Sequence, residues 1–371
     1  MQIRPVLGPV GVVSDCKLIR QFKIPAMMRD LYIRKLEDIF NRIYLGYGSS
    51  VEPSLGFGGG GVLLFLLYYG KLCPSDLLME FTYTVAESTF KKCEDARNSV
   101  KGAYFTGAAG TVAAFENITA NRLLDTDVHE VFRDVDQAVY QRITNFDLQK
   151  PRPGAKDELI EYGIYMQCRQ NSRLAPRGTI NYLQKVAALI SVVDYIGLLV
   201  DGTANINSKN INRICAYLIF LHRVSRQKVY PEICAGIMQR ILGLVERFLA
   251  DSRNLKRGIP TCLVYGIAAV QPRHTSPALT GIIDANLINP NPAGGLLNNI
   301  VDIQQLNRLY WSTQEADFRS NAALQIAALE DRVKGNLSRK EMGLAGLSGL
   351  GLCMLSYLDR ECLAWDSVLC V

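Results

Sequence analysis

The sequence predicts an all-α fold, in which helical hairpins repeat and close into an (α/α) double toroid. Almost no segment alternates apolar and polar residues as a half-buried strand does, whereas segments of helical period recur along the chain. Glycines in apolar segments return at intervals near fifty residues: 49 from Gly61 to Gly110, 53 from there to Gly163, and 103, which is two units, from there to Gly266. A repeat of that length fits one polar and one apolar helix.

Five segments mix charged with apolar residues at three-and-four spacing, which predicts amphipathic helices with one face in solvent. They are residues 24–44, 75–95, 128–143, 230–249 and 313–333. Pro74, Ser75 and Asp76 form a typical helix start before the second of these segments.

Other segments are apolar nearly all round and begin with small residues, which predicts buried helices whose backbones approach closely. They include residues 58–66, 107–115 and 346–355. Helices that are apolar on several sides favour a closed ring over an open solenoid, which usually buries one side of each helix. We expect a single domain over residues 1–371, with residues 1–50 supplying an N-terminal segment and the first outer helix. Because Gly266 and Gly295 are only 29 residues apart, the outer helix between them should be very short or missing.

Composition excludes several classes of protein. A net charge of +6 is too small to predict nucleic-acid binding. Ten scattered cysteines without a CxxC pair, and an amino terminus interrupted by Pro5 and Pro9, favour a reducing, cytoplasmic location without a signal peptide. The apolar core of residues 58–72 is short and Asp194 interrupts residues 186–200, so we expect buried helices and no stable membrane insertion.

Six segments together resemble the lanthionine synthetase C-like (LanC-like) cyclase family over nearly the whole chain. They are LGFGGGGVLLFLLYYGKL (55–72), GAYFTGAAGTVAAF (102–115), residues 205–249, RGIPTCLVYGIAAV (257–270), residues 281–310, and GLAGLSGLGLCMLSYLDRECLAWDSVL (343–369). The order of the glycine-opened helices and the ending Trp365-Asp366 make this resemblance specific.

The resemblance implies seven helical hairpins around a central zinc ion in a protein of lanthipeptide (modified peptide) biosynthesis. Zinc would hold a peptide Cys as a nucleophilic thiolate, which adds to a dehydrated Ser or Thr to form a carbon–sulfur bond. The family's first zinc ligand matches Thr261, with Cys262 one residue later, and a loop can absorb that shift. Its Cys-His ligand pair matches Ile288 and Asn289, neither of which is Cys or His.

The family's catalytic His position matches Lys209, and its acid matches Glu158. Arg257 and Tyr265 are candidates for contacts with substrate. Losing most of its ligands should abolish zinc binding, so we expect that zinc, the family's cofactor, is not held here.

Three histidines offer alternative ligands. His129 lies on a predicted outer helix, where a solvated face is the simpler interpretation, and His222 lies near a helix carboxyl end, where a cation is favourable. His274 could pair with Cys262, but two ligands are too few for a tight zinc site.

The sequence is compatible with three functions. The first is a zinc-dependent thioether cyclase. The second is a non-catalytic LanC-like scaffold that binds a precursor peptide or a peptide-modifying enzyme. The third is an acid-based hydrolase, for which only Glu158 and Asp157 are available. A candidate binding rim for an acidic leader peptide consists of Arg247, Arg253, Lys256 and Arg257, with Arg223, Arg226 and Lys228 nearby in the sequence.

Overall fold

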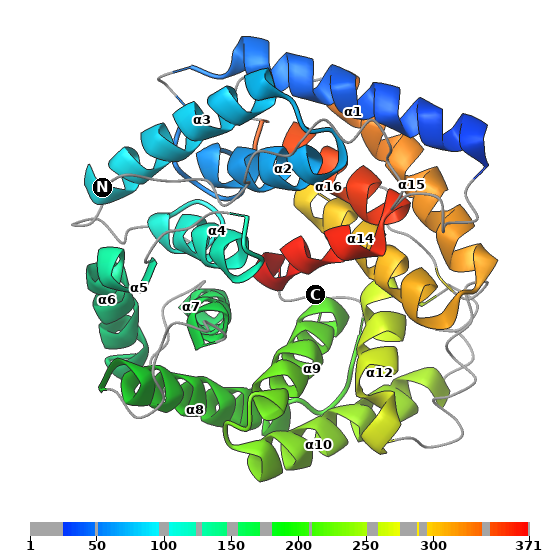
Figure 1. The fold of residues 1–371 in the computed structure, drawn as a ribbon. Coiled ribbons are helices and arrows are strands. Elements are labelled where there is room, and N and C mark those ends of the chain that lie inside the picture. The colour runs from blue at the N-terminus through cyan, green and yellow to red at the C-terminus, as the bar shows by residue number, and fades with distance from the viewer. Residues whose placement is uncertain are drawn as a thin grey trace. The chain divides into compact units, whose positions relative to one another are not determined.

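The computed structural model describes residues 25–48, 51–95, 104–123, 128–146, 155–170, 180–207, 210–250, 259–274, 288, 295–335 and 342–369. These residues form fourteen α-helices and one 3-10 helix, and the described ranges contain no strand, which confirms the all-α prediction (Figure 1). They divide into two compact units. Unit 1 is Met1–Val135 with Ile326–Trp365, and unit 2 is Asp136–Gln325 with Asp366–Val371.

Unit 1 combines amphipathic helices with helices that are buried on all sides. Its helices are α1 (Ala26–Gly46), α2 (Gly59–Leu72), α3 (Asp76–Asp95), α4 (Ala108–Ala120), the short α5 (Val128–Val131), the second half of α15 (Ala316–Gly335) and α16 (Leu347–Leu358). Every residue of α16, and all of α2 up to Gly70, is buried. The two predicted helix types are therefore present, and α2 packs against α16, α4 and α3 (Figure 1).

Glycines at the starts of α2, α4 and α16 let three chain segments interlock through their backbones. Gly56 donates its N–H to the Phe105 carbonyl at 2.7 Å, and Ala345 donates to the Gly56 carbonyl at 2.6 Å. A Cβ atom on Gly343 would lie 2.5 Å from the Gly58 nitrogen and 2.6 Å from the Gly56 oxygen. No side chain fits there, which is the close approach predicted from the glycine pattern.

Unit 2 holds the remaining helices. They are α6 (Arg133–Thr144), which begins in unit 1, α7 (Ala155–Gln170), α8 (Ile180–Asp201), α9 (Ile211–Arg226), α10 (Pro231–Ala250), α12 (Thr261–His274), α14 (Leu296–Thr313) and the first half of α15. The 3-10 helix η5 (Arg360–Leu369) ends in this unit. Helix α9 packs against both α10 and α12, and α12 packs against α14 (Figure 1).

Charged side chains tie the helices of unit 2 together. Asp136 of α6 forms an ion pair with Arg169 of α7 at 2.8 Å and with Lys185 of α8 at 3.2 Å, and it accepts a hydrogen bond from Tyr165 at 2.5 Å. The side chains of Arg169 and Lys185 are 0% and 3% exposed. Burial works against the charge of Asp136, but these partners outweigh it and hold the pKa of that carboxyl below its usual value.

The predicted amphipathic helices all occur. Residues 24–44 correspond to α1, 75–95 to α3, 128–143 to α5 and α6, 230–249 to α10, and 313–333 to α15. The Ser75 hydroxyl accepts a hydrogen bond from the Leu78 N–H at 3.2 Å, as expected of a residue at a helix start. Most of the segment between Gly266 and Gly295, where we expect a shortened outer helix, lies outside the described residues.

Helix α8 contains a segment, Asn181–Asp201, that is long and apolar enough to cross a membrane by length and composition. In the described part of the chain it is the one helix that meets this test. Half of its most apolar window is buried inside the protein. A core helix of a globular protein has the same properties, so its assignment as a buried helix stays a prediction.

Candidate functional site

Cys262, a candidate ligand in the sequence, lies at the start of α12 within unit 2 and contacts the start of α9. Cys262 is the second residue of α12 and is half-buried. Its thiol donates a hydrogen bond to the side-chain oxygen of Asn212 in α9, with 3.4 Å between sulfur and oxygen. Cys215, also on α9, is buried and hydrogen-bonded to Cys262. Two thiols and one amide thus form the group that we call the thiol site.

The two thiols of this site have different surroundings. The hydrogen bond to Cys262, together with burial, raises the pKa of the Cys215 thiol well above its usual value. Because the thiolate is both the nucleophile and the metal ligand, Cys215 is a poor candidate for either role at neutral pH. Cys262, which is half-buried, is the thiol that a reagent or metal ion would reach first.

A short backbone pairing brings Ile288, the one described residue of the second predicted ligand loop, to the same end of α12. Ile288 forms an isolated parallel bridge with Ile259, two residues before α12 begins. Ile288 is 9% exposed and Ile259 is 1% exposed, so this pairing is apolar. Ile288 therefore lies near the start of α12, where Cys262 is the second residue, and its side chain is hydrocarbon.

The start of α9 is the third matched position. Lys209 lies outside the described residues, as do Asn289 and Arg257. The next residue, Asn210, precedes α9 and its side-chain oxygen accepts the Asn207 N–H at 2.8 Å. Lys209 is therefore three residues before Asn212 of the thiol site, although its side chain is not placed.

The remaining predicted residues lie elsewhere or are only partly described. Glu158 is exposed in the first turn of α7, and no hydrogen bond or ion pair joins it to the thiol site among the residues with described side chains. Tyr265 is half-buried on α12, one turn after the thiol of Cys262. The side chain of Asp157 is not described, so the two-carboxylate hydrolase hypothesis has one placed acid.

The histidines complete no metal site in the described structure. His222 lies on α9, four residues before its end, as predicted. His129 is in α5 and His274 is the last residue of α12, and the side chains of both are outside the described set. No group of three or more His, Cys, Asp or Glu side chains comes together among the described residues. The thiol site offers two sulfurs, fewer than the three protein ligands of a tight zinc site, so these residues do not fit zinc.

The sequence pattern missed Cys215 and Asn212. Cys215 is buried within an apolar helix, and its contact with Cys262 is not visible in the sequence. A signal was present in the spacing, because residues three apart in a helix share one face. Asn212 and Cys215 have that spacing on α9.

The basic residues proposed as one rim separate into two groups. Helix α9 has 16 residues and is about 24 Å long. Arg223 and Arg226 lie at its carboxyl end, next to the turn into α10. Arg247 is near the far end of α10, which returns along α9. Exposed Arg247 is thus at the same end of the hairpin as Arg213, the neighbour of Asn212.

Compared with models of protein families and with curated proteins, the chain matches none.

Proposed function

We propose that this chain is a LanC-like protein of lanthipeptide biosynthesis that has lost zinc chemistry and binds a precursor peptide, or the enzyme that modifies it, as a non-catalytic scaffold. The architecture we propose is the closed (α/α) double toroid. The activity we propose is binding of an extended acidic peptide at the end of unit 2 where α9 and α12 begin.

The packing in unit 1 supports the ring. Helix α16, near the end of the chain, packs against α2, near its beginning, and their starts are joined by hydrogen bonds from Leu344 to Leu55 and from Ala345 to Gly56. An open solenoid would leave its first and last buried helices without each other as partners. Contact between the first and the last glycine-opened helix is what a closed array requires.

The observation that best supports a loss of zinc chemistry is the position of Ile288. It lies against Ile259 at the start of α12, in the loop where the resemblance requires a metal ligand. The sec-butyl side chain of Ile288 offers no lone pair, and its burial stabilises the fold through apolar contact. Selection for a folded scaffold would retain such a residue, whereas selection for zinc would not.

Basic side chains at the same end of the hairpin support an acidic peptide as partner. Arg213 and Arg247 are exposed there, and Arg253, Lys256 and Arg257 follow α10 in the sequence. A cluster of cations attracts an extended anionic segment and raises its rate of association. The scaffold would present that peptide to a partner enzyme without reacting with it.

The test is a titration with a fluorescein-labelled peptide of about twenty residues, rich in Asp and Glu. We expect Arg213→Glu with Arg247→Glu to weaken binding about tenfold or more, because two attractive contacts become repulsive. The matched control is Arg226→Glu with Lys228→Glu, which changes the net charge equally at the other end of the α9–α10 hairpin. Equal weakening by both pairs, or no binding by the natural protein, would contradict the proposed binding surface.

A further inference from the structure

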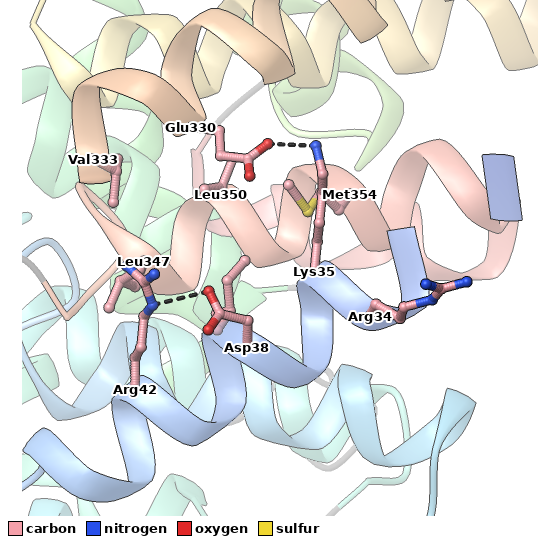
Figure 2. Close-up of a pocket in the computed structure, with 10 residues that line it drawn as sticks. Arg34, Lys35, Asp38, Arg42, Glu330, Val333, Leu347, Leu350 and Met354 are labelled. Atoms are coloured by element: carbon pink, nitrogen blue, oxygen red, sulfur yellow. Dashed lines mark hydrogen bonds and ion pairs between the residues drawn. The ribbon is translucent and has the colours of Figure 1, made fainter. Parts of the chain in front are cut away.

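A cavity of about 240 Å³ lies within unit 1, between α1, α15 and α16 (Figure 2). It belongs to neither the thiol site nor the peptide surface of unit 2. Its floor consists of apolar side chains, including Val333 of α15 and Leu347 and Leu350 of α16. These three are 2–4% exposed, so the floor belongs to the packed core. An apolar floor of this kind accepts a hydrocarbon group.

Two ion pairs stand at opposite sides of this floor. Lys35 of α1 pairs with Glu330 of α15 at 2.5 Å, and Arg42 pairs with Asp38, one turn earlier in α1, at 2.9 Å. Figure 2 shows Leu350 between the two pairs, while the guanidinium of Arg34 points away from both. The cavity therefore combines an apolar base with a charged rim that holds three cations and two carboxylates.

The two pairs differ in how readily they can exchange partners. Glu330 is 8% exposed, and the ammonium group of Lys35 also lies 5.7 Å from the centre of the Tyr32 ring. Burial therefore fixes the carboxylate, and the contact with Tyr32 fixes the ammonium group. The side chains of Arg42 and Asp38 are 32% and 55% exposed. Exposed pairs of this type contribute little free energy, because water screens the charges and both side chains stay mobile. Arg42 can therefore release Asp38 for another carboxylate at small cost.

We propose that this cavity binds an amphiphilic carboxylate, with its apolar group on Val333, Leu347 and Leu350 and its carboxylate on Arg42. The volume of the cavity is about eight times the roughly 30 Å³ that one water molecule occupies in the liquid. A hydrocarbon chain of about six carbons fits such a volume, whereas a long-chain lipid does not. A guanidinium offers two parallel N–H donors to a carboxylate, whereas an amine cannot accept them from Arg42. A free short-chain acid and the C-terminal residue of a peptide offer this same chemistry.

The test uses hexanoate as the probe, with the methyl groups of methionine labelled with ¹³C and followed by NMR. Met354 lines the cavity and is fully buried, so its signal reports on binding at this place. We expect hexanoate to shift the Met354 signal in a saturable way, and hexylamine and hexanol to bind about tenfold more weakly or not at all. A peptide ending in Gly-Gly-Leu, with a free or an amidated carboxyl group, distinguishes a peptide terminus from a free acid as the source.

Variants of Arg42, Asp38 and Arg34 test where the carboxylate binds. Arg42→Gln should weaken hexanoate binding about tenfold, because the charged donor is lost. Asp38→Asn should tighten it about two- to fivefold, because the competing carboxylate is removed. Arg34→Gln, the matched control, should change it less than about twofold. Binding of hexylamine as strong as that of hexanoate, no shift of the Met354 signal, or weakening by Asp38→Asn would overturn the proposal.

Discussion

The starts of the buried helices are joined in different ways in the two units. In unit 1, the segments that lead into α2, α4 and α16 meet backbone to backbone, with Gly56, Gly61 and Gly343 at the contacts. In unit 2, the starts of α9 and α12 meet through side chains, with the Cys262 thiol on the side-chain oxygen of Asn212. Backbone contact leaves no volume for a functional group, whereas side-chain contact allows each residue to change separately. Residues of the thiol site in unit 2 can therefore change without loss of the helices.

Gly61→Ala tests the backbone contact and should have the largest effect. A Cβ atom there would lie 2.5 Å from the Leu55 carbonyl oxygen and also against the backbone nitrogen of Leu344. Neither backbone can move without breaking the hydrogen bond between these two residues. We expect the free energy of unfolding to fall by more than about 4 kcal/mol, or the chain not to fold.

The matched control is Gly70→Ala in the same helix, where the nearest atom is a Leu78 methyl at 3.6 Å. That variant should be neutral or about 0.5–1 kcal/mol more stable, because alanine favours a helix. Urea denaturation followed by circular dichroism measures both. Equal stability of Gly61→Ala and Gly70→Ala would show that the close backbone contact at Gly61 does not stabilise the packing of these helices.

Asp136→Asn tests the side-chain contacts of unit 2. It leaves the charges of Arg169 and Lys185 buried and unpaired, which costs about 3–5 kcal/mol. Since the pKa of Asp136 is lowered in the folded protein, its contribution is fully present above the unfolded-state value of about 4 and is lost as the pH falls through the folded-state value. The difference between natural protein and variant should thus be largest at neutral pH and shrink in acid. Asp201→Asn, which breaks an exposed pair with Arg240, should change stability by less than about 1 kcal/mol at any pH.

Asp302→Asn tests a smaller difference between the units. Helix α14 of unit 2 carries this acid, whereas α2 and α16 of unit 1 carry none. Burial raises the pKa of Asp302 to about 7. Because the folded-state value lies above the unfolded-state value, ionisation destabilises the fold increasingly as the pH rises from about 4 to 7. The variant should be roughly 1–2 kcal/mol more stable than the natural protein at pH 8 and equal to it at pH 4.

Thermal unfolding at several pH values measures this effect, with the exposed Asp194→Asn on α8 as the control. A gain that does not depend on pH would mean that Asp302 is not the group responsible.

Most helices could be predicted because their signals are local. The three-and-four spacing of residues 75–95 and the Ser75 helix start need only neighbouring residues, and α3 follows them closely. The glycines before α2, α4 and α16 also predicted close backbone contact, since glycine alone permits it. Which segments meet was not contained in that pattern, because contact between α16 and α2 joins residues far apart in the sequence.

The thiol site was only partly predictable for the same reason. Cys262 was a candidate because it lies one residue after the position that matches the family's first zinc ligand. Ile288 was a candidate because it matches a ligand position but cannot bind a metal. Cys215 and Asn212 were missed, because their contacts to Cys262 span about fifty residues and depend on how α9 and α12 pack. The Asp136 cluster carries no local signal either, since its three charges come from three helices.

The most direct test of the account is the zinc content, by elemental analysis, of protein purified in the presence of zinc. We expect far less than one zinc per chain in the natural protein, and close to one when Ile288→Cys and Asn289→His supply the two ligands that the resemblance to LanC-like cyclases implies in addition to Cys262. Adding Cys262→Ala should remove that zinc again, because only two ligands remain. One zinc per natural chain that is lost in Cys262→Ala would contradict the account and favour an active cyclase.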